Sequence, residues 1–238
     1  MPDGCSPPFS KRLLDWWERH GRHDLPWQHP RTAYRVWISE IMLQQTQVGT
    51  VIPYFERWMR DFPDVETLAA ATLDEVLAHW SGLGYYARAR NLHKAAQVCV
   101  AEHGGALPET SEALSALPGI GLSTANAIVS QATGRPAAVL DGNVRRVLSR
   151  LLAEPAPDDR QLWQIAERLV RGSSPGDLNQ ALMELGALVC SPRAPSCSSC
   201  PVRSRCGARA APPGSFSMWK TPPRASSRRP SFTTTPLR

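Results

Sequence analysis

Residues 117–125 of the chain read LPGIGLSTA, and this stretch places Gly119 and Gly121 between two short helical patterns. Glycine lets the backbone turn sharply and lets phosphate oxygens approach the backbone amides closely. The second helical pattern begins directly after Gly121, so its unpaired N–H groups and its dipole would face such an anion. A Pro-Gly-x-Gly turn by itself is more often only a turn. Its apolar flanking helices make this one a candidate phosphate-binding hairpin.

Helical periodicity extends over almost the whole chain on both sides of this hairpin. Apolar residues recur at spacings of three and four, and no stretch alternates convincingly at period two. We therefore expect an all-α protein of about ten helices. The expected helical segments are 13–20, 34–45, 51–62, 85–103, 113–117, 123–133, 144–152, 162–170 and 178–189, with short helices entered at Asp64 and Asp74.

Glu40 is the only charged residue in the helical stretch VWISEIMLQ, residues 36–44. Three of its four neighbours at helical spacing are apolar, so the carboxylate lies on an apolar helix face. Such surroundings raise the pKa of a carboxyl group, as a general acid requires. The alternative, an ordinary Glu on the exposed side of an amphipathic helix, is less favoured for the same reason.

Asp141 lies in the stretch AVLDGNVRR, residues 138–146, soon after the helix that follows the hairpin. An Asp before a helix is most often an N-cap. From these residues alone that interpretation is favoured, although a capping Asp can also take part in chemistry.

Four cysteines, Cys190, Cys197, Cys200 and Cys206, follow the spacing C-x6-C-x2-C-x5-C. Four thiolates within 17 residues can surround one metal centre, and so dense a set has no packing purpose. In a chain without an export signal, such a cluster indicates a metal site rather than disulfides. Zinc prefers two separated C-x2-C pairs, whereas this spacing fits a [4Fe–4S] cluster better, although spacing alone leaves zinc open.

The formal net charge of +6 suggests a polyanionic partner such as nucleic acid. Residues 1–184 hold 18 basic and 21 acidic side chains, however, whereas residues 185–238 hold nine basic and no acidic ones. We therefore expect recognition of such a partner to depend on a local face of amides, arginines and inserted side chains, with Arg193, Arg203 and Arg205 as candidate phosphate contacts. The sequence contains no membrane span or secretory signal, so we expect a cytoplasmic protein, nucleoid-associated in a bacterium.

Over roughly residues 9–206 the chain resembles the MutY-type adenine DNA glycosylases of the endonuclease III-like superfamily. Besides the hairpin and the cysteine spacing, the most specific segments are LPW at 25–27, EIMLQQTQV at 40–48, GLGYYARARNL at 82–92 and LDGNV at 140–144. The resemblance implies a two-lobed helix–hairpin–helix fold. A six-helix barrel module would span residues 25–135, with the hairpin motif at about 111–133, and residues 1–24 plus 136–206 would form a lobe with one [4Fe–4S] cluster.

The resemblance implies a monomer that excises adenine mispaired with 8-oxoguanine or guanine from double-stranded DNA. Glu40 would protonate adenine at N7 and assist attack by water, Asp141 would stabilise or transiently bond the oxocarbenium-like sugar, and Asn143 would orient this chemistry. The implied binding residues are Trp27, Leu43 and Glu184 around adenine, Gln45, Thr46, Leu83 and Tyr85 at the base stack, and Gly119, Gly121 and Ser123 at the hairpin. For each of these residues the alternative role is packing or capping, and this alternative is strongest for Leu43, Leu83 and Glu184.

The first alternative function is an endonuclease III-like glycosylase with strand-cleaving lyase activity on damaged pyrimidines. That chemistry needs an amine, and that family carries a Lys at the position of Ser123. The only lysines here are Lys11, Lys94 and Lys220, so a monofunctional glycosylase is expected. The second alternative, a non-catalytic iron–sulfur DNA-binding protein, is disfavoured by the presence of both carboxylates.

Residues 207–238 are rich in Pro, Ser, Thr, Ala and Arg and contain no acidic residue, which predicts a disordered tail. MutY-type proteins usually continue past the cluster into a Nudix-like domain, of which these residues show no pattern. We expect a truncated or frame-shifted product with an aberrant tail, an intact catalytic half and a weaker preference for 8-oxoguanine over guanine. Leu122 stands where many relatives have a polar residue, which we expect to weaken a phosphate contact slightly.

Overall fold

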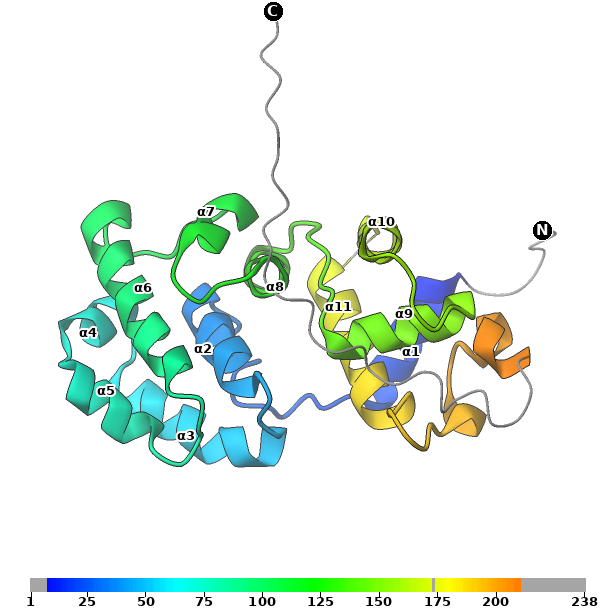
Figure 1. Cartoon of the computed structure of the whole chain (residues 1–238), viewed down its shortest axis with the longest axis horizontal. Helices are drawn as coiled ribbons and strands as arrows, with labels where there is room; N and C mark the ends of the chain where they lie inside the picture. The colour runs from blue at the N-terminus through cyan, green and yellow to red at the C-terminus, as the bar shows by residue number, and fades with distance from the viewer. Residues whose placement is uncertain (1–7, 173, 211–238) are drawn as a thin grey trace, which may run out of the picture.

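The computed structural model describes residues 8–172 and 174–210, and within them the secondary structure is helical, without a strand. Eleven α-helices are described, and they form two lobes that lie side by side (Figure 1). The expectation of an all-α protein is therefore confirmed. None of the described helices combines the length and the apolar character needed to cross a bilayer.

The first lobe is built around an apolar core in which Trp37, Trp58 and Trp80 are fully buried. The rings of Trp58 and Trp80 meet edge to face, with their centroids 5.7 Å apart. Its helices are α2 (Ala33–Leu43), α3 (Val48–Asp61), α4 (Val65–Ala70), α5 (Leu73–Trp80), α6 (Ala87–His103), α7 (Ser111–Ala116) and α8 (Leu122–Thr133).

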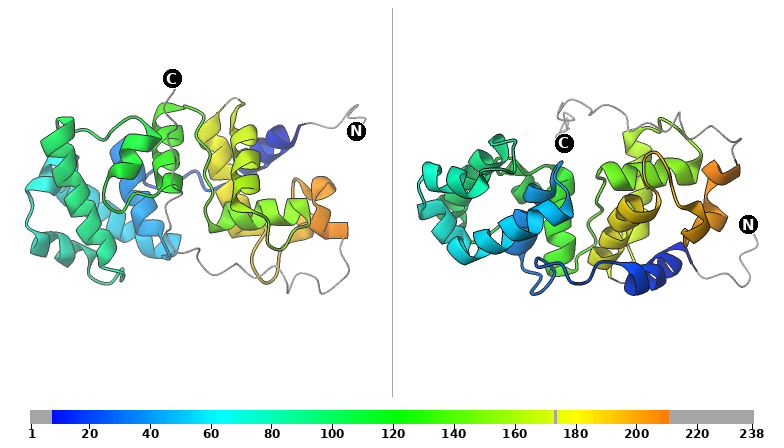
Figure 2. Two further views of the ribbon diagram at one scale, coloured as in Figure 1. Left: turned by 45° about the horizontal axis from the view of Figure 1, so that its top comes forward. Right: turned by 90° about the horizontal axis from the view of Figure 1, so that it is seen from below.

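The second lobe combines the first described helix with helices from the other end of the chain. Leu13, Trp16 and Trp17 of α1 are buried in a core whose other residues run from Ala138 to Val202. Figure 2 shows α1 lying along this lobe, with the following segment crossing to the first lobe. The elements are α1 (Phe9–His20), α9 (Gly142–Leu152), α10 (Asp159–Val170), α11 (Pro175–Glu184), the π-helical turn Leu185–Val189 and the 3-10 turns Cys197–Ser199, Arg203–Arg205 and Gly207–Ala210.

Several helix ends differ from the sequence-based expectation for local reasons. Asp64 caps α4 as expected, but Asp74 lies inside α5, whose N-cap is Thr72 in a capping box with Glu75. The helix expected from residue 85 begins only at Ala87, because Tyr85 adopts a left-handed φ of 49°. The helix expected over 178–189 is α-helical only to residue 184, after which the backbone widens into the π-helical turn.

The start of the predicted disordered tail also needs correction. Gly207–Ala210 form a 3-10 helix, and the side chain of Ala208 is buried. An added Cβ at Gly207 would lie 3.0 Å from the carbonyl oxygen of Leu151, so this turn packs against the end of α9. The rest of the predicted tail, residues 211–238, lies outside the described residues.

The two lobes meet where α11 packs against α8. Gly176 lies so close to α8 that an added Cβ would be 2.6 Å from the carbonyl oxygen of Ser130. Across the same boundary, Arg31 Nη1 donates a hydrogen bond to Asp177 Oδ1 at 2.7 Å. These contacts fix the distance between the lobes. A cavity that contains the predicted catalytic residues lies between the two lobes.

Candidate active site

A cavity of about 1090 Å³ opens between the lobes. Residues from the end of α2, the hairpin helix α8, the start of α9 and α11 line it, so both lobes supply its walls. Nine of the predicted site residues line this cavity: Trp27, Glu40, Leu43, Gln45, Thr46, Ser123, Asp141, Asn143 and Glu184. Residues far apart in the sequence therefore converge on one space.

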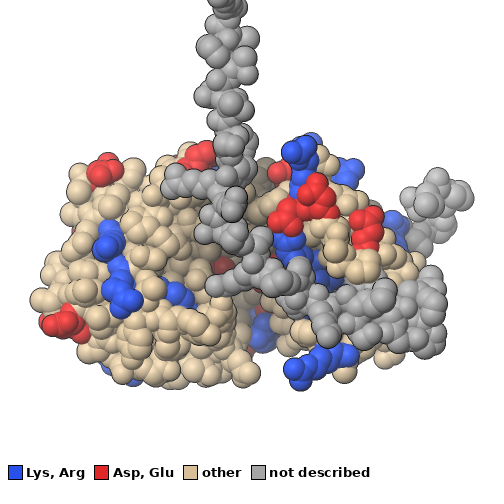
Figure 3. Space-filling view, viewed as in Figure 1, with Lys and Arg blue, Asp and Glu red and all other residues tan. Residues whose placement is uncertain are grey.

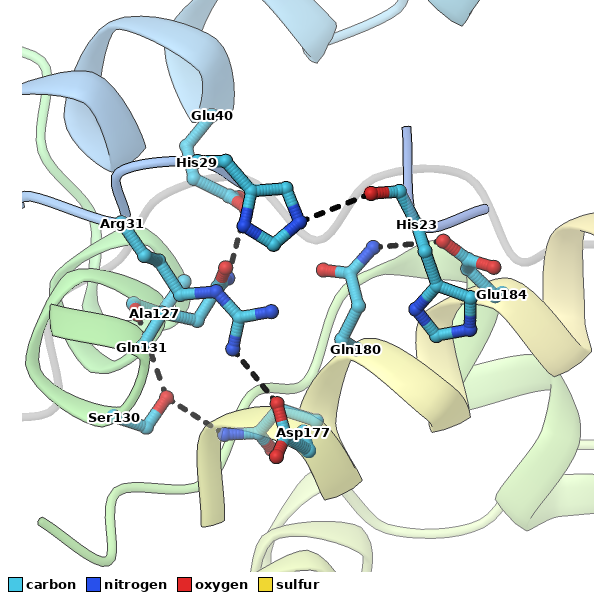
Figure 4. A network of polar contacts seen from close by, with 11 residues as sticks. His23, His29, Arg31, Glu40, Ala127, Ser130, Gln131, Asp177, Gln180 and Glu184 are labelled. Atoms are coloured by element: carbon cyan, nitrogen blue, oxygen red, sulfur yellow. Dashed lines mark hydrogen bonds and ion pairs between the residues drawn. The ribbon is translucent and has the colours of Figure 1, made fainter. Parts of the chain in front are cut away.

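Glu40 points from α2 toward the cavity, and Figure 4 shows it beside Gln131 of α8. Gln131 Nε2 donates a hydrogen bond to Glu40 Oε1 at 3.5 Å. Burial, followed by the negative charge of Asp141, raises the pKa of Glu40 to about 7, although the bond from Gln131 opposes this rise. The side chain can therefore carry a proton at neutral pH and release it to a bound ligand.

Asp141 occupies the N-cap of α9, as its sequence context predicts, and its carboxylate faces the cavity as well. Its Oδ1 accepts from the Val144 amide at 2.7 Å, and its Oδ2 accepts from Asn143 Nδ2 at 3.0 Å. Burial raises the pKa of Asp141, while these bonds and the charge of Arg146 oppose the rise. One oxygen thus caps the helix while the other remains oriented by a side-chain amide.

Asn143 is itself held from behind by Arg146. Arg146 Nη2 donates to Asn143 Oδ1 at 2.8 Å and to the carbonyl of Gly186 at 2.7 Å, and its Nε donates to the carbonyl of Cys190 at 2.8 Å. Arg146 could not be selected as a site residue from the sequence, because an Arg within an amphipathic helix is usually exposed. Its burial becomes visible only when α9 packs against the π-helical turn.

The segment that leads into Asp141 is fixed by side chains from both lobes. The carbonyls of residues 137 and 138 accept from Asn179 Nδ2 and Asn126 Nδ2 at 2.7 and 2.6 Å. The amides of residues 139 and 140 donate to Asn179 Oδ1 and Ser123 Oγ at 3.1 and 3.2 Å. Four successive residues thus have a backbone group held in place, which sets the position at which Asp141 enters the cavity.

The opposite wall contains Glu184, which is fully buried on α11. Its Oε1 accepts from Gln180 Nε2 at 3.0 Å, and its Oε2 accepts from the backbone amide of Arg22 at 2.9 Å. Figure 4 shows Gln180 and Glu184 extending from α11 toward the space that Glu40 faces. Trp27 is also buried, and it packs edge to face against Phe55 with 5.4 Å between ring centroids.

Four predicted binding residues lie outside the cavity lining. Tyr85 is 63% exposed, with its ring centroid 5.5 Å from the guanidinium carbon of Arg88, whereas Leu83 is buried in the first core, which favours a packing role for its side chain. Gly119 and Gly121 form the turn between α7 and α8. Gly119 has a φ of +77°, and an added Cβ would lie 2.7 Å from Asn91 Cβ, so only glycine fits there without a shift.

Arg88 connects the loops that carry Gln45 and Tyr85, which both have left-handed backbones with φ of 60° and 49°. Its Nη1 donates to three carbonyls at and just after the end of α2, at 2.6 to 2.9 Å. Its Nη2 donates to Thr46 Oγ1 at 3.2 Å and to the carbonyls of residues 83 and 84 at 3.1 and 3.2 Å. Arg88 could not be identified as a site residue from the sequence, because nothing in its own helix signals that it is buried.

The four clustered cysteines lie at the far end of the second lobe rather than in the cavity. Among the described residues, no three His, Cys, Asp or Glu side chains converge as ligands of a single metal ion. Burial, and then the nearby charges of the other three thiols, raises the pKa of Cys200 to about 11. Arg150 Nη1 lies 3.2 Å from Cys190 Sγ, where it would stabilise a thiolate. The residue types, four cysteines with an arginine beside one sulfur, are those of a thiolate-bound cluster, although the described side chains do not converge on one point.

Positive charge is dispersed over the face seen in Figure 3, where Lys and Arg side chains occur in small separate groups. Leu122, the first residue of α8, is 50% exposed beside the hairpin, and it adds no charge there.

The chain is similar to known proteins over most of its length. It is 49% identical over 215 residues to the adenine DNA glycosylase of Homo sapiens, covering 84% of this chain and 39% of the human protein. It is 43% identical over 203 residues to that of Buchnera aphidicola (strain APS), covering 83% of this chain and 58% of the relative. The chain thus spans about two fifths to three fifths of the length of these curated relatives.

Solved structures show the same fold. A thermostable thymine-DNA glycosylase superposes with a TM-score of 0.79 at 30% identity, covering 85% of this chain and 95% of that one. A non-covalent endonuclease III–DNA complex superposes with a TM-score of 0.69 at 23% identity, covering 84% and 92%. The expected helix–hairpin–helix glycosylase fold is therefore confirmed. Residues 38–172 match the model of the HhH-GPD superfamily base excision DNA repair proteins, and the chain belongs to that superfamily.

Proposed function

We propose that the protein is a monofunctional adenine DNA glycosylase that removes adenine mispaired with 8-oxoguanine or guanine in double-stranded DNA. The single observation that carries this proposal is the pair of carboxylates, Glu40 and Asp141, in one cavity between the lobes. Two carboxyl groups with different surroundings are the usual requirement for breaking a glycosidic bond. The names of the curated relatives support adenine as the base.

In this mechanism the adenosine leaves the base stack and enters the cavity. Trp27 and Leu43 line the same cavity and supply apolar contact to the base. Glu40 protonates adenine at N7, which converts the base into a leaving group, and then assists the attack of water. Asp141 stabilises the positive charge that develops on the sugar, or bonds to it transiently.

Asn143 keeps Asp141 oriented through the bond to Oδ2, so that this oxygen does not rotate away from the sugar. Glu184 contributes a fixed polar wall, since both of its oxygens already accept hydrogen bonds within the protein. Gln45 and exposed Tyr85 fill the space that the adenosine vacates, and the hairpin holds one DNA strand through its amides.

A lyase reaction on damaged pyrimidines is disfavoured because no lysine belongs to the cavity lining among the described residues. Ser123 occupies the relevant position, and its Oγ accepts from the Leu140 amide at 3.2 Å. A hydroxyl cannot form the Schiff base that strand cleavage by β-elimination requires.

Cys190, Cys197, Cys200 and Cys206 would hold one [4Fe–4S] cluster, which would cross-link the end of the second lobe. Arg150 supports this assignment through its bonds to the Sγ and the carbonyl of Cys190 and to the carbonyl of Ser191. We also infer that the protein acts as a monomer on DNA in the cytoplasm, within the nucleoid if the host is a bacterium.

The proposal is tested with a duplex that carries one adenine opposite 8-oxoguanine, and with a second that carries adenine opposite guanine. The unaltered protein should produce an abasic site that breaks only on heating in alkali. Asp141→Asn should lose this activity while retaining DNA binding. Strand breaks without alkali would favour the lyase, and full activity of the variant would contradict the mechanism. Absorbance near ~400 nm in purified protein would support the iron cluster.

A further inference from the structure

The cavity between the lobes contains more negative than positive charge. Its charged lining residues are Arg22, Glu40, Asp141, Arg145, Asp159 and Glu184. A nucleotide that enters it carries its own phosphates, which these carboxylates repel. Arg22 is already paired with buried Glu184, with 3.7 Å between Nε and Oε1. Of the described cations in the lining, Arg145 is the better placed to receive a phosphate, because its own partner, Asp159, is 53% exposed whereas Glu184 is buried.

Arg145 lies in the first turn of α9, and its amide donates to the carbonyl of Asp141 at 2.9 Å. Residues four apart in a helix have Cβ atoms about 5–6 Å from each other, so Arg145 stands one turn behind Asp141. Its side chain is 23% exposed, and its guanidinium binds both carboxylate oxygens of Asp159, with Nη2 and Oδ2 3.0 Å apart. The side chain of Asp159 is 53% exposed at the start of α10.

We propose that Arg145 binds a backbone phosphate of the strand carrying the extruded adenosine, and that Asp159 is the counter-ion it releases. This inference rests on the proposed function, because it places the phosphate beside the sugar that Asp141 serves. A guanidinium that already binds a carboxylate with two nitrogens can bind a phosphate in the same forked geometry.

The exchange costs little because Asp159 is more than half exposed and is rehydrated when the pair separates. Ion pairs near the surface contribute little to stability. Before DNA arrives, the pair holds the guanidinium at the cavity rather than in bulk solvent. Asp159 therefore orients Arg145 and competes with the phosphate at the same time.

The test measures the dissociation constant for a duplex containing a non-hydrolysable adenosine analogue opposite 8-oxoguanine, by fluorescence anisotropy at several salt concentrations. Arg145→Gln should weaken binding about tenfold, as expected for loss of a charged hydrogen bond. It should also reduce the slope of log affinity against log salt by about 1. Asp159→Asn should tighten binding by about two- to fivefold.

Asp158→Asn provides the matched control. It removes the same charge one residue away, and asparagine also serves as the N-cap that Asp158 provides to α10. When Arg145 is present, Asp159→Asn should tighten DNA binding more than Asp158→Asn does. When each is combined with Arg145→Gln, the two Asp variants should bind DNA with equal affinity. Equal effects of the two Asp variants, or an unchanged affinity in Arg145→Gln, would overturn the inference. Absence of DNA binding by the unaltered protein would overturn the proposed function as well, and thermal unfolding would confirm that each variant is folded.

Discussion

Glu40 and Asp141 share one cavity, but their surroundings stabilise the ionised carboxylate to different extents. Asp141 accepts hydrogen bonds on both oxygens, at 2.7 and 3.0 Å, which favour its ionised form. Glu40 accepts one long bond, at 3.5 Å, and lies on an apolar helix face. The two groups are therefore suited to the different tasks that the proposed mechanism gives them, with Glu40 as the proton donor and Asp141 as the carboxylate that faces positive charge.

The raised pKa of Glu40 predicts a pH-dependent cost to stability. Its pKa is about 7 in the folded protein against an ordinary 4.5, so the unfolded chain loses this proton at lower pH. Stability should therefore fall as pH rises between these two values. Glu40→Gln should abolish excision, yet it should increase the free energy of unfolding at pH 8 by about 1–3 kcal/mol, with little change at pH 4.5.

Urea unfolding at both pH values measures this effect. The matched control is Glu56→Gln, which changes an exposed glutamate on α3. Single-turnover rates of the unaltered protein should decline as pH rises above about 7, because the acid form of Glu40 is then depleted. If Glu40→Gln is less stable than the unaltered protein at pH 8, then the ionisation of Glu40 does not lower the stability of the fold.

The sequence reveals a residue's chemistry when its local neighbours determine its surroundings. Glu40 could be selected because the residues one helical turn away are apolar, and Asp141 because it precedes a helix. Arg88 and Asn179 could not be selected, because their partners lie about 45 and 40 residues away in the chain. The polar contacts that position the site are tertiary, and no local pattern encodes them.

At the scale of single elements, the hairpin shows that its two glycines have different roles. Gly119 has a φ of +77° and lies against Asn91, whereas an added Cβ at Gly121 would meet nothing within 4 Å. Gly121 is also the N-cap of α8, with an ordinary φ of −89°. The sequence could predict the turn from both glycines, but not which of them the turn requires.

Gly119→Ala should destabilise the protein by about 2–4 kcal/mol, because it combines a left-handed backbone with a close contact. Gly121→Ala should cost about 1 kcal/mol or less, since only the capping preference changes. Chemical unfolding of both variants gives the comparison. Equal losses would mean that the turn relaxes around an alanine at either position.

Arg88 links the end of α2 to the turn before α6. Arg88→Lys keeps the charge but cannot reproduce the forked bonds to two loops, so it should lower the free energy of unfolding by about 2–4 kcal/mol. It should also weaken DNA binding, because Gln45 and Tyr85 lose their fixed conformations. Arg90→Lys changes an exposed arginine on the same helix and serves as the control. Similar unfolding midpoints for the two variants would refute this role.

At the scale of the whole molecule, the site depends on how the lobes are joined. Asn179 is fully buried on α11, and it bonds with the segment before Asp141 and with Ser130 Oγ at 2.9 Å. The sequence pattern predicts the helices, and the family resemblance implies the division between lobes, but the side chains that fix the lobes relative to each other emerge only from packing.

Asn179→Asp should preserve the side chain's shape but remove the amide that donates to Ala137 and Ser130. We expect a loss of about 2–4 kcal/mol in stability and a lower single-turnover rate, since Asp141 is no longer held in place. The control is Asp177→Asn, which weakens the more exposed pair with Arg31 at the same boundary. Equal excision rates in Asn179→Asp and Asp177→Asn would show that Asn179 does not position Asp141.

The second core also has a consequence for the order in which the protein is made. Leu13, Trp16 and Trp17 leave the ribosome long before most of their core, since the buried residues of the second core outside α1 begin only at Ala138. At about 5–20 residues per second, the roughly 120 residues between them take on the order of 6–24 s to synthesise. During this interval α1 exposes two tryptophans and a leucine while the first lobe can already fold. Nascent chains should therefore depend on chaperones until α11 emerges and covers this surface.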